Sequence, residues 1–388
     1  MSRISLSWVV VLGLLSAIGP LCTDFYLPAL PEITQQLSAT GTQTQLSLTA
    51  ALIGLGLGQL FFGPLSDRIG RKKPLALSLL LFIFSSAMCA ITYDIHMLIA
   101  WRFLQGFAGA GGSVLSRSIA RDKYQGTLLT QFFALLMSVN GIAPVLSPVL
   151  GGWIITAFDW RILFWAMAAI GIILLLLSLT VLHETLPGKS AASVAQRQDE
   201  TPVLKNRRFM RYCLIQAFMM AGLFSYIGSS SFVIQSEYAM SAMQFSLLFG
   251  LNGIGLIIAA LIFSRLARRF SAEALLRGGQ LLAVTFAAIT LLFAWLPLPT
   301  LALVGLFFTV SLMSGISTVA GAEAMSAVDA AQSGTASALM GTLMFVFGGI
   351  AAPLAGLGGE TMLKMSLAMA ICYLLALLLG LSKPRSAR

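Results

Sequence analysis

Charged residues are scarce in this chain of 388 residues: Asp, Glu, Lys and Arg make up 10%, whereas hydrophobic residues make up 58%. A soluble globular domain carries about 25% charged residues, so this composition excludes an ordinary water-soluble fold. The formal net charge is +10. The basic residues lie in short clusters between apolar stretches, which argues against nucleic-acid binding and suggests a role in membrane topology.

Residues that bind metals or form covalent intermediates are also few. The two histidines are isolated, and the four cysteines lie inside or at the edges of apolar stretches, without the spacing of a metal site or a disulfide framework. We interpret the cysteines as small buried side chains. The sequence shows no Gly-rich nucleotide loop and no Ser/His/Asp arrangement, so we predict no metal, no cofactor and no enzymatic activity.

Long apolar stretches dominate the chain instead. A helix that spans a membrane needs about 20 mostly apolar residues. The first stretch follows Arg3 and has no clear small-residue cleavage site, so we interpret it as a retained membrane helix rather than a signal peptide. The sequence therefore predicts an all-α polytopic membrane protein with twelve transmembrane helices, at residues 6–28, 43–64, 74–93, 95–116, 130–156, 160–182, 209–234, 242–264, 273–296, 299–322, 331–357 and 361–381.

The longest polar stretch falls between the sixth and seventh predicted helices. It divides the chain into an N-terminal six-helix bundle (1–185), a cytoplasmic linker (186–207) and a C-terminal six-helix bundle (208–388). If both termini are cytoplasmic, 21 of the 24 lysines and arginines lie on the cytoplasmic side, Arg117 in a loop among them. This bias predicts the orientation. The three exceptions are Arg102, Arg161 and Lys364.

A dense charged turn joins the second and third predicted helices. Residues 63–73 read Gly-Pro-Leu-Ser-Asp-Arg-Ile-Gly-Arg-Lys-Lys, and residues 264–270 form a weaker echo of this turn in the second bundle. Such a repeat is typical of transporters built from two related bundles. We expect a cytoplasmic gate here, with an ion pair between Arg71 and Asp122, formed by Gly63, Asp67, Arg68, Gly70, Arg71 and Asp122.

Asp24 is an acid within the first predicted helix, four residues before Pro28. A carboxylate inside a membrane span is costly and usually faces a cavity or a partner. Pro28 removes the hydrogen bond to the carbonyl of Asp24, so we expect a kink there. The alternative is that Asp24 lies near the outer surface, where it is solvated and purely structural.

Arg102 is a permanent charge about two turns inside the fourth predicted helix, on the same broad face as Gln105. We expect Arg102 to tune Asp24 or to hold the polar network beside it. The alternative is a structural arginine bonded to backbone carbonyls. Further polar candidates for a cavity are Tyr26, Gln105, Asn140 and Asn252. In the fifth helix, we expect bending and close backbone approach at Pro144, Pro148, Gly151 and Gly152.

Three of these segments resemble motifs of the major facilitator superfamily: the 63–73 turn, the segment with Arg102 and Gln105, and the Pro144 to Gly152 segment, which is associated with drug:proton antiporters. Three further stretches are similar to the Bcr/CflA branch, which includes bicyclomycin-resistance proteins: Asp-Phe-Tyr-Leu-Pro-Ala-Leu-Pro from Asp24, Trp-Arg-x-x-Phe-Trp from Trp160, and Glu-Thr-Leu-Pro from Glu184.

The resemblance implies proton-coupled efflux of small amphipathic compounds by alternating access. It implies a multi-pass protein of the bacterial inner membrane, monomeric, linked to antibiotic resistance, with Asp24 and Arg102 at the proton- and substrate-coupling positions. Some related multidrug antiporters have a second acid about two turns before the first, where this chain has Ser16. This difference argues against a two-acid mechanism and against export of dications.

Two other functions stay open at this point. The chain could be a dedicated proton-coupled transporter of one metabolite, such as a nucleoside or a sugar. A more distant alternative is a membrane receptor or sensor that transports nothing, against which the intact turn motif and the lack of an added soluble domain argue.

Overall fold

The structure is a computed structural model that describes residues 6–124, 126–185, 203–328 and 333–382. Helices are the only regular elements in this described part of the chain. In order they are α1 (Leu6–Ser16), α2 (Ile18–Asp24), η1 (Leu27–Ala29), α3 (Leu30–Gln36), α4 (Gly41–Ile69), α5 (Lys72–Ile91), α6 (Ile95–Lys123), α7 (Gly126–Ile155), α8 (Arg161–Val181), η3 (Val203–Lys205), α9 (Arg207–Phe232), η4 (Val233–Glu237), α10 (Ala242–Leu266), α11 (Ala272–Trp295), α12 (Pro299–Ser326), α13 (Ser333–Ala355) and α14 (Met362–Leu381).

The predicted all-α membrane fold is confirmed. The segments α1, α2, η1 and α3 together form one span. With the eleven helices α4 to α14, the described residues contain twelve long helical segments, as predicted. Nine spans in this part of the chain are long and apolar enough to cross a membrane. Two other helices, α7 and α13, contribute shorter described apolar stretches, Ile142–Ile155 and Leu339–Ala355. The twelfth, α6, carries Arg102, Gln105 and Arg117 within its length.

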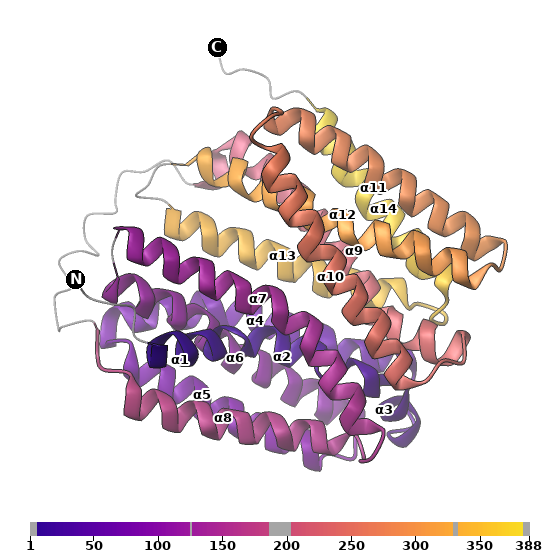
Figure 1. The fold of residues 1–388 in the computed structure, drawn as a ribbon. Helices are drawn as coiled ribbons and strands as arrows, with labels where there is room; N and C mark the ends of the chain where they lie inside the picture. The colour runs from indigo at the N-terminus through magenta and orange to yellow at the C-terminus, as the bar shows by residue number, and fades with distance from the viewer. Residues whose placement is uncertain (1–5, 125, 186–202, 329–332, 383–388) are drawn as a thin grey trace. The chain divides into compact units, whose positions relative to one another are not determined.

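The chain divides into two compact units. The first comprises Met1–Ala39 and Leu46–Asp199, and the second comprises Thr40–Gln45 and Glu200–Arg388. In the first unit, α5 packs against both α6 and α8, while α1 and α2 pack against α6 and α7. In the second unit, α9 packs against α12, α13 and α14, and α11 runs beside α14 (Figure 1). The predicted linker falls mostly on residues 186–202, outside the described part of the chain, so its boundaries stay a prediction.

The kink predicted in the first helix is present. The α-helical hydrogen bonds end at Asp24, and the chain passes through η1, where the N–H of Ala29 donates to the carbonyl of Tyr26 at 2.9 Å. Pro28 has no N–H for the carbonyl of Asp24, which explains the break at this point. The predicted end of this helix at residue 28 was wrong, because α3 continues the span to Gln36.

Two other predicted boundaries were also wrong, because helices extend into the charged segments. Most of the 63–73 turn is helical: α4 continues through Pro64 to Ile69, and only Gly70 and Arg71 form the turn. Gly70 adopts φ +92°, the left-handed conformation that commonly ends a helix. Similarly, α6 continues beyond residue 116 to Lys123, so Arg117 is helical and not in a loop.

The backbones of α4 and α6 touch through glycines contributed by both helices. A Cβ atom on Gly54 would overlap the carbonyl oxygen of Phe103, and one on Gly106 would overlap the carbonyl oxygen of Ala51. Small residues allow such close helix packing within membranes. This contact fixes the position of α6, and therefore of Arg102, against α4.

We expect Gly54→Ala to lower the free energy of unfolding by about 1–3 kcal/mol, because a methyl group must push two backbones apart. The matched control is Gly278→Ala in α11, where an added Cβ has nothing within 4 Å. The control should be neutral or slightly stabilising, since alanine favours helix over glycine. Thermal unfolding of the purified proteins measures both, and equal stabilities of the two variants would contradict the close contact.

Candidate functional site

Asp24 lies at the broken end of α2, with only 5% of its surface exposed. Within the described residues, no lysine, arginine or histidine is close enough to form an ion pair with it. The break is packed against α7: a Cβ atom on Gly151 would overlap the carbonyl oxygen of Phe25. Glycine in the α7 motif therefore allows the neighbouring helix to approach the backbone next to the acid.

Arg102 is fully buried, and its guanidinium binds neutral acceptors instead of Asp24. One terminal nitrogen donates to the backbone carbonyl of Cys22 at 2.6 Å, and the other donates to the side-chain oxygen of Gln105. The guanidinium also lies over the ring of Tyr26, 4.1 Å from its centre, where a cation–π interaction is favourable. Arg102 forms no ion pair with Asp24 in this conformation, and its bonds belong to the polar network beside the acid. Arg102 instead fixes the backbone two residues before the acid.

A second layer of hydrogen bonds holds the residues around Arg102. The amide of Gln105 donates to the hydroxyl of Ser86 at 2.7 Å. The hydroxyls of Tyr26 and Ser47 lie 3.2 Å apart. Tyr26, Ser47, Ser86 and Gln105 are all fully buried. The structure thus brings Tyr26, Arg102 and Gln105 together beside Asp24, within the first unit.

The other cavity candidates lie elsewhere. Asn140 belongs to α7, but its side chain lies outside the described part of the structure. Pro144 and Pro148 lie inside α7, as expected, and Gly152 is buried. In the second unit, the amide of Asn252 donates to the hydroxyl of Tyr226 at 2.8 Å, and the ring of Tyr226 stacks on Phe249.

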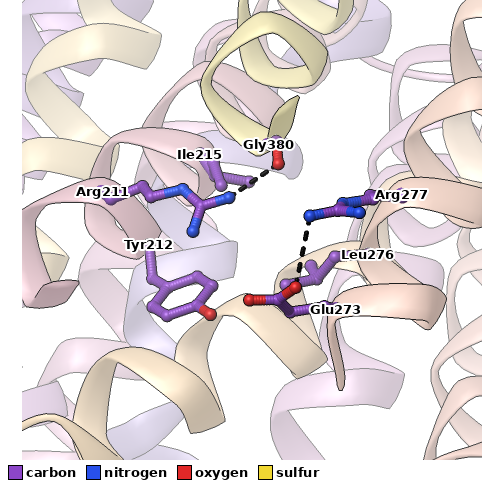
Figure 2. Close-up of a pocket in the computed structure, with 7 residues that line it drawn as sticks. All are labelled: Arg211, Tyr212, Ile215, Glu273, Leu276, Arg277 and Gly380. Atoms are coloured by element: carbon purple, nitrogen blue, oxygen red, sulfur yellow. Dashed lines mark hydrogen bonds and ion pairs between the residues drawn. The ribbon is translucent and has the colours of Figure 1, made fainter. Parts of the chain in front are cut away.

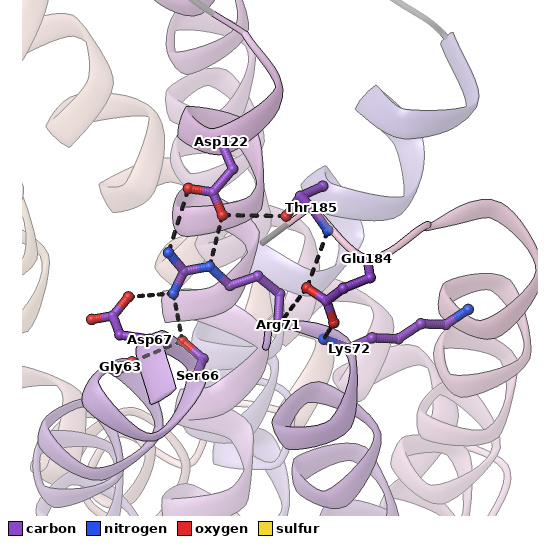
Figure 3. A network of polar contacts seen from close by, with 8 residues as sticks. All are labelled: Gly63, Ser66, Asp67, Arg71, Lys72, Asp122, Glu184 and Thr185. Carbon is purple, nitrogen blue, oxygen red and sulfur yellow. Dashed lines mark hydrogen bonds and ion pairs between the residues drawn. The ribbon is translucent and has the colours of Figure 1, made fainter. Parts of the chain in front are cut away.

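A second polar cluster surrounds Arg71 in the turn between α4 and α5 (Figure 3). Its Nε donates to Asp122 at 2.7 Å, so the expected ion pair is present. One terminal nitrogen, Nη1, donates both to Asp67 at 2.5 Å and to Ser66 at 2.7 Å. Burial disfavours the charge of Arg71, but the hydrogen bonds and charges of Asp122 and Asp67 outweigh it and hold the pKa of Arg71 above its usual value.

The remaining residues of the predicted gate have lesser roles in this cluster. The carbonyl of Gly63 accepts a hydrogen bond from Ser66 at 2.7 Å, which orients the hydroxyl toward Arg71. Arg68 is exposed. Gly70 provides the turn, and a Cβ atom there would lie 2.7 Å from a carboxylate oxygen of Glu184.

Glu184 completes the cluster, a contact that the sequence motif did not predict. Its carboxylate accepts hydrogen bonds from the backbone N–H groups of Arg71 and Lys72, at 2.9 and 3.1 Å (Figure 3). A carboxylate at the N-terminus of a helix is favoured by the unpaired N–H groups and by the helix dipole. The neighbouring Thr185 donates to Asp122 at 3.2 Å. The segment after α8 is therefore bound to the α4–α5 turn and to the end of α6.

The end of the unit opposite to this cluster has its own network, built from the Trp160–Arg161 motif. Trp160 and Arg161 both donate to the side-chain oxygen of Gln36, each at 2.9 Å, and the amide of Gln36 donates to Asp159 at 3.0 Å. Partial burial disfavours the charge of Asp159, but hydrogen bonds from Arg161 and Gln36 and the charge of Arg161 hold its pKa below the usual value. The motif thus binds the end of α3 to the start of α8.

The second unit does not repeat the Arg71 cluster. In the echo of the turn, Arg265, Arg268 and Arg269 are exposed, and none of the ion pairs among the described residues includes them. A small pocket between α9, α11 and α14 contains two other arginines (Figure 2). There, Arg211 donates to the carbonyl of Gly380 at 2.6 Å, and Arg277 pairs with Glu273 at 3.2 Å. The Arg211 bond joins α9 to the end of α14, whereas the Arg277–Glu273 pair lies within α11.

The geometry around Arg102 can be tested by a double-mutant cycle on unfolding free energy. We expect Arg102→Ala and Gln105→Ala to be coupled by about 0.5–3 kcal/mol, because the two side chains share a hydrogen bond. The control cycle pairs Arg102→Ala with Glu273→Gln in the second unit, which should be additive to within about 0.5 kcal/mol because the two residues share no partner in the described structure. Additive effects of Arg102→Ala and Gln105→Ala would contradict the shared hydrogen bond.

Comparisons with known proteins agree with this fold. Residues 12–353 match the family described as the Major Facilitator Superfamily. The chain resembles the crystal structure of a D-xylose-proton symporter with a TM-score of 0.78 and 15% identity, covering 95% of this chain and 96% of that one. It also resembles a bacterial homolog of the human lysosomal transporter Spinster, with a TM-score of 0.77 and 15% identity over 96% and 95% of the two chains. At these identities, the likeness shows the fold alone.

Two relatives in sequence cover almost the whole length of the chain. The chain is 38% identical to the uncharacterized MFS-type transporter YdgK of Bacillus subtilis, over 98% of this chain and 96% of that protein. It is 28% identical to the bicyclomycin resistance protein homolog of Haemophilus influenzae, over 96% and 94% of the two chains. It is 32% identical to the multidrug resistance protein MdtL of Escherichia coli K12, over 62% and 61%. The family match and these relatives show that the chain belongs to the major facilitator superfamily and is a polytopic membrane transporter, not an enzyme.

Proposed function

We propose that this transporter exports small amphipathic compounds in exchange for protons, as a drug:proton antiporter of the Bcr/CflA type. The names of two relatives, a bicyclomycin resistance protein homolog and a multidrug resistance protein, support this class of substrate. The proposal locates the chain in the bacterial inner membrane as a monomer with both termini in the cytoplasm. The clustering of basic residues supports the orientation, and the bacterial relatives support the location.

The observation that carries the proposal is the buried carboxylate of Asp24 at the break in the first helix. A carboxylate that is 5% exposed and has no ion-pair partner among the described residues is costly when charged, and protonation removes that cost. The break gives the acid a local backbone that differs from a regular helix. Arg102 fixes the backbone next to Asp24, since it binds the carbonyl of Cys22 and cannot lose its proton.

The cycle follows from this chemistry. Asp24 takes a proton in the outward-facing form, which weakens substrate binding and releases the compound outside. In the inward-facing form the proton leaves, and substrate binds again. A membrane potential supplies about 2.3 kcal/mol per elementary charge per 100 mV, which suffices to drive uphill export when one net charge moves in each cycle.

We also propose that the Arg71 cluster acts as the cytoplasmic gate. Asp67 is 58% exposed although it pairs with Arg71, so its outer surface is available to a further partner. A contact between the Asp67 carboxylate and the N-terminus of another helix would stabilise the closed gate by only about 0.3–1 kcal/mol. Conformational states commonly differ by only a few kcal/mol, so a small contribution changes their populations.

Asp24→Asn should abolish proton-driven export while the protein stays folded, because the amide cannot carry the proton. The measurement is substrate-stimulated proton release and uptake of labelled bicyclomycin in inverted membrane vesicles. Accumulation should fall to the level seen without a proton gradient. The control is Asp94→Asn at the N-cap of α6, which keeps a good capping residue and should transport normally. Full proton release by Asp24→Asn would rule out the coupling role.

Asp67→Asn should shift the population toward the inward-facing state and slow turnover, with little change in substrate affinity of that state. Spin labels on Arg121→Cys in α6 and Ser337→Cys in α13, both exposed, measure the distance distribution at these helix ends. The control is Glu273→Gln, which removes the acid of another i,i+4 pair with arginine in the second unit. If Asp67→Asn leaves the distribution unaltered, the turn is a topological anchor only.

A further inference from the structure

Arg117 lies within α6, and its guanidinium takes no part in the proposed gate or in the Asp24 site. It lies six residues before the end of the helix, and it is only partly exposed. Its Nε donates to the carbonyl of Ser113, one turn earlier, at 3.1 Å. In the described part of the chain, no ion pair and no other hydrogen bond involves its two terminal nitrogens.

The surroundings of Arg117 are small and polar. Ser116 is fully buried and donates to the same carbonyl of Ser113 at 2.9 Å. The hydroxyl of Ser113 donates to the carbonyl of Ser16 at 3.3 Å, at the end of α1. Arg117 is therefore next to the face of α6 that meets the first helix near its α1–α2 break, in a region of hydroxyl and carbonyl groups.

The acids of the first unit are committed elsewhere. Asp67 and Asp122 bind Arg71, and Asp159 binds Arg161. Asp94 caps the N-terminus of α6, Glu32 accepts a hydrogen bond from Gln36, and Glu184 caps the N-terminus of α5. Asp24, the remaining acid among the described residues of this unit, forms no ion pair there. Because arginine keeps its proton, Arg117 carries a positive charge that no described carboxylate neutralises in an ion pair.

Long basic side chains near helix ends usually extend toward the membrane surface. Arg117 instead folds against its own helix, whereas Arg121, one turn further along, is exposed. Free terminal nitrogens in a planar fork suit an oxyanion, which can accept two parallel hydrogen bonds. Arg102 and Arg117 are about 22 Å apart along α6 and within about 60° around its axis, given the helix geometry.

We propose that Arg117 binds the carboxylate or phosphate group of the transported molecule, so that the substrates are organic anions and zwitterions rather than cations. The inference rests on the proposed transport function and specifies its substrate class. Ser16 agrees with it, because an acid there would place a negative charge on the helix that faces this part of α6. A lipid headgroup offers the same oxyanion chemistry, so the experiment must separate the two sources.

The test is a ligand-detected NMR titration of the full chain in nanodiscs of phosphatidylcholine, without a proton gradient. The probes share one skeleton: phenylacetate, its neutral analogue phenylacetamide, and the cation phenethylammonium. Wild type should bind phenylacetate roughly 10- to 100-fold more tightly than phenylacetamide, which is the range of one charge-assisted hydrogen-bonded contact. Arg117→Gln should abolish this preference, and Arg117→Lys should retain part of it.

Two further variants keep the test decisive. Arg121→Gln removes the same charge four residues away and should leave the preference unchanged. Ser16→Asp should neutralise the positive charge of Arg117 and remove the preference for phenylacetate, and this result can be measured even if Arg117→Gln fails to fold. An absent preference in wild type, or a preference that survives Arg117→Gln, would overturn the proposal.

Nanodiscs that contain phosphatidylglycerol test whether Arg117 binds a lipid headgroup instead of a substrate. The preference of wild type for phenylacetate should persist in these nanodiscs. If phosphatidylglycerol removes it from wild type while Arg117→Gln is insensitive to the lipid, Arg117 binds a headgroup and the substrate proposal is wrong. Because binding is measured at equilibrium, a failure of proton coupling at Asp24 leaves this result intact and is seen only in the vesicle transport assay.

Discussion

The burial of a permanent positive charge, the guanidinium of Arg102, is the constraint on which the interior of the first unit depends. An arginine that cannot lose its proton must find acceptors wherever it is buried. The carbonyl of Cys22 is available because it lies next to the broken end of α2, and the side chain of Gln105 is held in place by Ser86. The close contact of α4 with α6 and the approach of α7 to Phe25 then bring the helices around this network. The proline breaks the helix directly after the buried Asp24, so charge, break and acid form one arrangement.

Two kinds of cationic site coexist in this unit. Arg71 is bonded to acids through both its side chain and its backbone, and these bonds join three segments that are distant in sequence: the α4–α5 turn, the end of α6 and the segment after α8. Arg102 and Arg117 are bonded only to neutral groups in the described part of the chain. The first arrangement stabilises a turn through full neutralisation, whereas the second leaves positive potential inside the helices. In the proposed transport cycle, the neutralised Arg71 cluster would hold the gate closed, while the cations without an acidic partner would keep interactions available for a ligand.

The sequence predicted the features that depend on local chemistry. Apolar stretches predicted the twelve helices, Pro28 predicted the break after Asp24, and the turn motif predicted the pairing of Arg71 with Asp122. It failed where the outcome depends on distant segments. Helix ends in charged stretches were placed too early, since polar residues near a membrane surface favour helix as readily as loop when their side chains find partners. The acceptors of Arg102 were left open, because a backbone carbonyl gives no signal in the sequence. Glu184 was identified as part of a family motif, but its contact with the α4–α5 turn was not predicted.

The capping of α5 by Glu184 also bears on the order in which the chain assembles. The acid lies 113 residues after the N–H of Arg71 that it binds, at the end of the sixth helix. The turn between the second and third helices therefore stays incomplete during synthesis until the whole first unit has emerged. All partners of Arg71 lie within residues 66–185 of the chain, so the cluster can close before any of α9 to α14 is made. The order of the chain thus allows the first bundle to form its last described contact without any residue of the second.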